Sequence, residues 1–223
     1  YRFSNTLRFT QTPGRVTFKG ASKSCTILQY TGTGIGILVD SLSSSSNASN
    51  SLTGIVLEDF MLRSNTGSHA ISLREVGAVD VKNVLILGQL NDADPGGGWK
   101  EAGISLGGTY ACCNASEVHI DHVNIRYIGG AGIKSDEINN KHRVWITSSQ
   151  VEGCAKSGIT VASSGGAWDI TGNTIEGNGL AEISVAHAVG LNISGNYFET
   201  PWAPSSILLV PAAASTPVSD VTI

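Results

Sequence analysis

The sequence has little net charge and no long apolar segment, and each shortage argues against a class of protein. Its 14 lysines and arginines are outnumbered by 18 aspartates and glutamates, so no basic field is present to attract nucleic acid. No run of about 18 apolar residues occurs, so we expect no membrane-spanning segment. We therefore expect no nucleic-acid partner and no membrane span.

Cysteine is also scarce, with four residues in 223. Cys112 and Cys113 are adjacent, which disfavours a bond between them, and no Cys-x-x-Cys pair predicts a zinc site. Cys25 and Cys154 lie far apart in the sequence. We expect buried free thiols, with a disulfide within 107–117 as the alternative.

Glycine is abundant, with 27 residues, and short words recur. WDITGNTIEGN at 168–178 is echoed by LNISGNYFE at 191–199. The shared frame is an apolar residue, two others, a small or apolar residue, one other and a second apolar residue. It starts at Leu57, Val81, Ile120, Ile146, Ile170 and Ile193. A second column keeps step with it: Ile71, Ile104, Ile133, Ile159, Ile183 and Ile207.

Within each repeat apolar and polar residues alternate, which predicts strands half buried on one face, and helical spacing is nowhere sustained. Gly and Asn recur every few residues and predict tight corners. We therefore expect an all-β fold, a single-stranded right-handed parallel β-helix of about seven coils of about 23–26 residues. A leucine-rich repeat would require Leu where Ile and Val dominate here.

We expect residues 1–223 to form a single β-helix domain, with a first coil over about 1–40 and regular coils over about 54–223. Departures from the period predict inserted loops at 41–53, 88–101 and 107–117. The second and third loops flank a strand at 103–106, where they would form the walls of a groove. Because neither end has a polar cap, we expect a fragment of a longer protein.

Asn173 and Asn196 occupy the same inward position in successive repeats, with Ser149 one repeat earlier. An inward Asn at a corner can bond the turn backbone and its copy in the next coil. We therefore expect a structural asparagine ladder.

Two stretches carry a resemblance to known families. RVTFKGASKSCTILQY at 15–30 resembles the first coil of pectate-lyase-like β-helix proteins. TGNTIEGNG and ISGNYFE are similar to coils of bacteriophage tail-spike and related polysaccharide-degrading proteins. The resemblance implies a polysaccharide partner, an extracellular or virion-surface location and a homotrimer. It leaves the activity open, because this superfamily includes lyases, hydrolases, epimerases and non-catalytic shafts.

One candidate site comes from the repeat itself. Glu152, Glu176 and Glu199 each follow the last inward residue of their coils, with Arg126 in the same column earlier. Neighbours in such a column lie about 4.8 Å apart and alternate members about 9.6 Å, which suits the carboxylate pairs of glycosidases. The alternative is a solvated surface ladder.

A second candidate site is the groove. Asp136 and Glu137 form its acidic pair, and Trp99 and Tyr110 on the walls would stack on sugar rings. The alternatives are a solvated corner for the acidic pair and a subunit interface for the aromatic residues. For lyase chemistry, the base that removes the proton next to a uronate would be Lys134 or His187. The uronate carboxylate would be neutralised by Arg74 or Arg126.

We expect a polysaccharide hydrolase or lyase, a depolymerase acting on a bacterial surface or extracellular glycan. The alternative is a non-catalytic carbohydrate-binding or structural shaft module of an appendage. Incomplete pectate lyase signatures and absent polygalacturonase ones argue against pectin as the substrate. We expect no cofactor, although Asp92 and Asp94 resemble the start of a calcium loop that lacks its later ligands.

Overall fold

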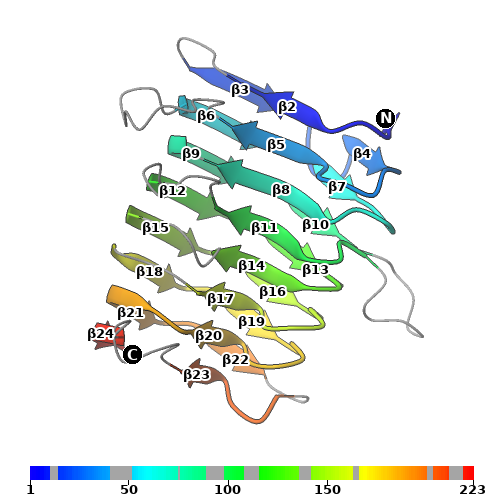
Figure 1. Ribbon diagram of the computed structural model, residues 1–223. Coiled ribbons are helices and arrows are strands. Elements are labelled where there is room, and N and C mark those ends of the chain that lie inside the picture. The colour runs from blue at the N-terminus through cyan, green and yellow to red at the C-terminus, as the bar shows by residue number, and fades with distance from the viewer. Residues whose placement is uncertain are drawn as a thin grey trace.

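The computed structural model describes residues 1–10, 15–40, 52–74, 76–88, 98–107, 116–135, 142–162, 166–199, 203–210 and 218–223. Within these ranges the chain forms 24 strands and no helix, so they contain no helical segment that could cross a bilayer. The strands wind into three sheets with parallel pairing throughout (Figure 1). The fold is a right-handed parallel β-helix, as the sequence predicts.

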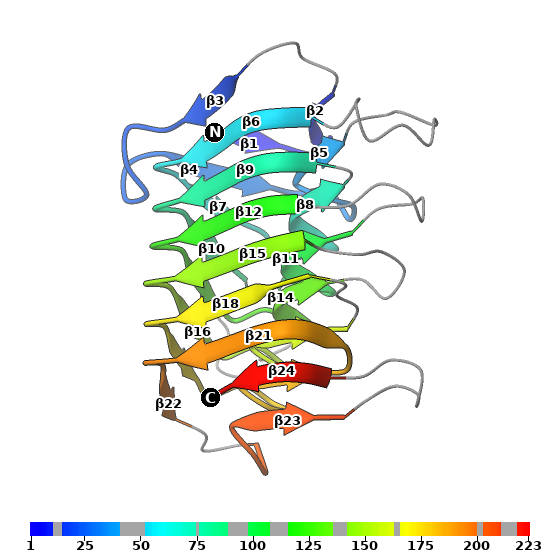
Figure 2. The ribbon, with the colours of Figure 1, turned by 90° about the vertical axis from the view of Figure 1, so that its left-hand side faces the viewer.

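Each turn of the helix contributes one strand to each sheet. Sheet A contains β1 (Arg2–Phe3), β4 (Ile27–Tyr30), β7 (Met61–Arg63), β10 (Leu85–Leu87), β13 (Asn124–Arg126), β16 (Gln150–Glu152), β19 (Thr174–Glu176) and β22 (Tyr197–Glu199). Sheet B contains β2 (Leu7–Phe9), β5 (Ile37–Asp40), β8 (His69–Arg74), β11 (Ala102–Leu106), β14 (Ala131–Ser135), β17 (Ile159–Val161), β20 (Ile183–Val185) and β23 (Ile207–Leu209). Sheet C, which faces the viewer in Figure 2, contains β3 (Val16–Lys19), β6 (Leu52–Glu58), β9 (Val76–Lys82), β12 (Ser116–Asp121), β15 (His142–Thr147), β18 (Trp168–Thr171), β21 (Ala188–Ser194) and β24 (Val218–Thr222).

The two predicted apolar columns form the core. Ile120, Ile146, Ile170 and Ile193 are paired in successive strands of sheet C. Ile71, Ile104, Ile133, Ile159 and Ile183 are paired in the same way in sheet B. All are buried, so the sequence period is confirmed as one coil of the helix.

A residue in the left-handed region turns the chain from sheet C into sheet A. This position is Asp59, Asn83, His122, Ser148, Gly172 or Gly195, with φ between 49° and 66°. The next position points inward and carries the asparagines. Asn173 accepts a hydrogen bond from the backbone N of Ser149 (2.9 Å) and donates to the carbonyl of Ile146 (2.8 Å). Its own backbone N donates to Asn196 (2.9 Å), which confirms the ladder.

A second buried polar pair lies beyond sheet A, at the corner that leads into sheet B. Asn178 donates to the Glu182 carboxylate and to the carbonyl of Val151, and it accepts from the backbone N of Cys154. Asn178 and Glu182 are fully buried. Burial raises the pKa of Glu182 although Asn178 opposes this. Each of these polar atoms thus has a partner, but a carboxyl remains enclosed in the core.

Trp99 is also in the core, where its ring stacks on Tyr30 with centroids 5.6 Å apart and planes 12° from parallel. The ring fills space that two glycines leave open. A Cβ on Gly67 would lie 2.2 Å from Trp99 Cζ3, and one on Gly36 would lie 2.8 Å from Cη2. The prediction of an exposed sugar-stacking ring at Trp99 is therefore wrong, because this part of the inserted segment packs inward.

The cysteines differ from one another. Cys154 is a buried free thiol, as expected, and burial raises its pKa. Cys25 is also free but exposed, contrary to expectation. Cys112 and Cys113 lie outside the described residues, as do most of the predicted inserted loops.

Candidate functional site

The outward face of sheet A carries the predicted column of charged residues. Arg126, Glu152, Glu176 and Glu199 are paired in register on β13, β16, β19 and β22. The alternation of a strand explains this placement, since each follows an inward residue and so points to the outer surface. The four side chains therefore form one row, although their catalytic and binding roles stay predictions.

Gln150 links the members of this row. Its Nε2 donates to Oε2 of Glu152 (2.7 Å) and to Oε1 of Glu176 (3.3 Å). Its Oε1 accepts from Arg126 (2.9 Å) and from Asn124 (3.0 Å). Arg126 also pairs with Glu152 (3.0 Å) and donates to Asn124 (2.7 Å). These five residues form the Gln150 network, in which each side chain holds another in place.

The network perturbs the ionisation of one glutamate. Burial raises the pKa of Glu152, and the neighbouring carboxylate of Glu176 adds to the rise, while Arg126 opposes it. Only 17% of the Glu152 side chain is exposed. General acid catalysis uses a carboxyl whose pKa is raised by burial and by a second carboxylate beside it.

A depression of about 370 Å³ lies beside the network, where sheet C turns into sheet A. Lys23, His122, Asn124, Gln150 and Thr174 are among its lining residues. His122 is exposed and its Nδ1 lies 2.8 Å from Oδ2 of Asp121. Burial alone would raise the pKa of Asp121, but hydrogen bonds from His122 and Thr147 lower it overall. The depression thus places side-chain amide and hydroxyl groups beside a histidine whose ring is held by Asp121.

The Gln150 network was not expected from the sequence, although a signal for it exists. Asn124 and Gln150 each stand two residues before a member of the charged row, so strand alternation places them on the same face. The Asp121–His122 pair lies inside VHIDHV at 118–123, but nothing in that word alone indicates the pairing.

The predicted groove on sheet B is only partly described. Ser72, Ser105 and Lys134 are paired in successive strands, and Arg74 donates to Ser72 (3.2 Å), so Arg74 and Lys134 share the outward face. Ser72 and Ser105 are buried, so their side chains are not exposed to a ligand.

His187 follows β20, further along the same sheet, whereas Arg126 lies on sheet A. The structure therefore does not bring Arg126 together with either predicted lyase base. Asp136, Glu137 and Tyr110 lie outside the described residues. So do Asp92 and Asp94, and no cluster of metal-ligating side chains occurs among the residues with described positions.

Comparison with known proteins adds little to this picture. No family model and no curated protein matches the chain. A solved structure from Geobacillus virus E2, described as ORF18, is similar over 92% of this chain and 51% of that chain, with 11% identity and a TM-score of 0.38. The chain thus spans about half the length of that protein, and the likeness assigns it to neither the tail-spike nor the pectate-lyase-like proteins.

Proposed function

We propose that the protein binds an extended polysaccharide along the outward face of sheet A. The observation that carries this proposal is the Gln150 network, because its amide, guanidinium and carboxylate groups hold one another in fixed positions. Sugar hydroxyls both donate and accept hydrogen bonds, and such groups are their natural partners. The strands repeat about every 4.8 Å, so the same kinds of polar group recur along a linear ligand.

The depression beside the network supports the same proposal. A polymer lying along β13, β16 and β19 would contact the network on one side and His122 and Thr174 in the depression on the other. A rigid β-helix presents these groups without reorganisation, which lowers the entropic cost of binding.

The test is affinity for a panel of neutral and acidic polysaccharides, measured by isothermal titration. Gln150→Ala removes the residue that links Glu152 to Glu176, and we expect it to weaken glycan binding at least about tenfold. Asn192→Ala on sheet C removes an amide of similar exposure and should leave affinity unchanged. Equal affinity of Gln150→Ala and the unchanged protein would place any glycan site elsewhere.

A second candidate function, glycoside hydrolysis, is favoured by the raised pKa of Glu152. Glu152 would act as the general acid and Glu176 as the base or nucleophile, since paired residues of adjacent strands lie about 4.8 Å apart. Glu176→Gln keeps the shape of the side chain and should lower turnover at least about 100-fold. Glu58→Gln, on sheet C, is the matched control.

Assays for reducing ends and for the absorbance of unsaturated uronates distinguish hydrolysis from lyase chemistry. If the uronate signal appears, Lys134 or His187 becomes the candidate base, with Arg74 as its cationic partner. If Asp136→Asn or Glu137→Gln abolishes cleavage and Glu176→Gln does not, the active site belongs to sheet B. The homotrimer and the extracellular or virion-surface location belong to this proposal, and sedimentation equilibrium tests the former.

A further inference from the structure

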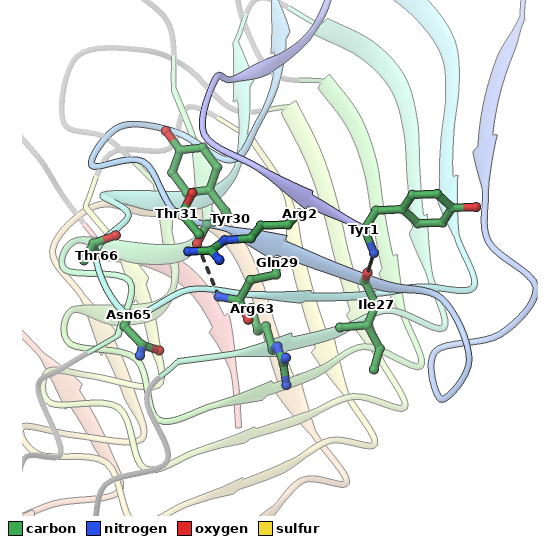
Figure 3. Close-up of a pocket in the computed structure, with 9 residues that line it drawn as sticks. All are labelled: Tyr1, Arg2, Ile27, Gln29, Tyr30, Thr31, Arg63, Asn65 and Thr66. Atoms are coloured by element: carbon green, nitrogen blue, oxygen red, sulfur yellow. Dashed lines mark hydrogen bonds between the residues drawn. The ribbon is translucent and has the colours of Figure 1, made fainter.

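A pocket of about 750 Å³ opens on the outward face of sheet A, toward the N-terminal end of the helix. Arg2, Gln29, Arg63, Asn65 and Thr66 are among the residues that line it (Figure 3). Only β10 separates its strands β1, β4 and β7 from the strands of the Gln150 network, in the same sheet and on the same side. A ligand long enough to follow sheet A would reach both places.

The two arginines of the pocket flank one strand. Arg2 is paired with Gln29, and Gln29 with Arg63, so the Cα atoms of the arginines are about 9.6 Å apart by two strand spacings. Figure 3 shows the two side chains on either side of Gln29, with Asn65 and Thr66 at one end of the pocket. Both arginines are exposed to solvent.

Several cations of the chain pair with a carboxylate. Arg8 pairs with Asp40 (3.8 Å), Lys19 with Glu58 (2.9 Å) and Arg126 with Glu152 (3.0 Å). Within the described ranges, neither guanidinium of the pocket has an ion-pair or hydrogen-bond partner, and no acidic residue lines the pocket. Two cations that share a concave surface without a counterion attract an anion from solution.

The chemistry of the donors indicates which anion fits. A guanidinium presents planar, forked N–H groups that match carboxylate, sulfate and phosphate oxygens in a bidentate way. The amides of Gln29 and Asn65 add neutral donors and acceptors suited to hydroxyl groups on the same ligand. Further along the same row stand Glu152, Glu176 and Glu199, which repel an anion.

We infer that Arg2 and Arg63 form a binding site for the anionic substituent, carboxylate or sulfate, of a glycan that lies along sheet A. The inference rests on the proposed function and narrows its ligand to an acidic polysaccharide. The outward row of sheet A changes from arginines near the N-terminal end to glutamates further along. The anionic group of the glycan should therefore lie at the arginine end of the row.

The experiment compares three polysaccharides that share one backbone: uncharged, carboxylated and sulfated. We expect the full chain to bind a charged form at least about tenfold more tightly than the uncharged form at low salt, and this preference to shrink as salt screens it. Arg63→Gln should remove most of the preference. Arg8→Gln removes the same charge from sheet B and should leave it intact.

The outcomes separate this inference from the proposed function. Equal affinity for charged and uncharged glycans, unchanged by Arg63→Gln, overturns the inference but leaves glycan binding on sheet A. No binding of any glycan overturns both. A preference that Arg8→Gln reduces as much as Arg63→Gln does reflects net charge alone and also overturns the site. Selectivity between the carboxylated and sulfated forms supports it and identifies the group.

Discussion

Oδ1 of Asn196 accepts hydrogen bonds from both the backbone N (2.9 Å) and the side-chain Nδ2 (3.0 Å) of Asn173, one coil earlier. Asn196 in turn donates to the carbonyl of Ile170 (2.7 Å). The amide of each coil therefore satisfies the corner backbone of the coil before it. This relationship explains why the words at 168–178 and 191–199 repeat.

Asn173→Ala should lower the free energy of unfolding by about 2–4 kcal/mol, because it leaves the buried backbone N of Ser149 and the carbonyl of Ile146 unpaired. Urea denaturation measures the change. Asn192→Ala removes a partly exposed amide with one hydrogen bond, to Asp169, and should cost less than about 1 kcal/mol. Equal costs for the two variants would contradict a structural role for the ladder.

Trp99→Ala should lower the free energy of unfolding by about 3–5 kcal/mol, because it leaves a cavity against Tyr30, Gly36 and Gly67. Thermal or urea unfolding measures the loss. Glycan affinity of the folded variant should be unchanged, since the ring does not reach the surface. A variant that keeps its stability but loses glycan binding would return Trp99 to the ligand site.

The Glu152 carboxyl should titrate above 4.5, its ordinary pKa, in a carbon-detected NMR titration. Glu176→Gln removes a neighbouring negative charge and should lower the pKa of Glu152. Arg126→Gln removes the opposing positive charge and should raise it further. If neither substitution changes the pKa of Glu152, the two carboxylates do not act as a pair.

Glu182 should make stability fall as pH rises. Its pKa is raised in the folded state, so the folded protein holds the proton after the unfolded chain begins to release it near pH 4.5. Stability therefore declines from that pH upward and levels off above the folded pKa. Urea midpoints between about pH 4 and about pH 8 measure the slope.

Glu182→Gln cannot titrate and should flatten that part of the pH profile. Glu199→Gln, an exposed glutamate of sheet A, serves as control and should keep the slope of the unchanged protein. If both variants follow the same profile, the pH dependence has another source.

The sequence predicts the core of this fold well for a physical reason. A β-helix places the same residue type at the same point of every coil, so apolar columns such as Ile120, Ile146 and Ile170 recur at the period of the chain. The row of Glu152, Glu176 and Glu199 follows from the same period. A repeat thus reports both which residues are buried and which lie beside one another.

Features that depart from the period cannot be predicted from it. Trp99 lies in an inserted segment, where an aromatic ring that packs inward looks the same in sequence as one that faces solvent. The link that Gln150 makes between Glu152 and Glu176 depends on side-chain rotamers, which no spacing encodes. His122, which contacts Asp121, has a left-handed backbone, and the sequence shows no glycine there that would indicate one.

The pairing of each strand with one neighbour on either side makes the molecule a one-dimensional lattice. β18, for example, is bonded in sheet C to β15 and β21 alone among the described strands. A disturbance at one coil therefore propagates only through its two interfaces, and its influence decays over a correlation length set by their strength. Two substitutions several coils apart should act additively on stability, whereas substitutions in adjacent coils should be coupled.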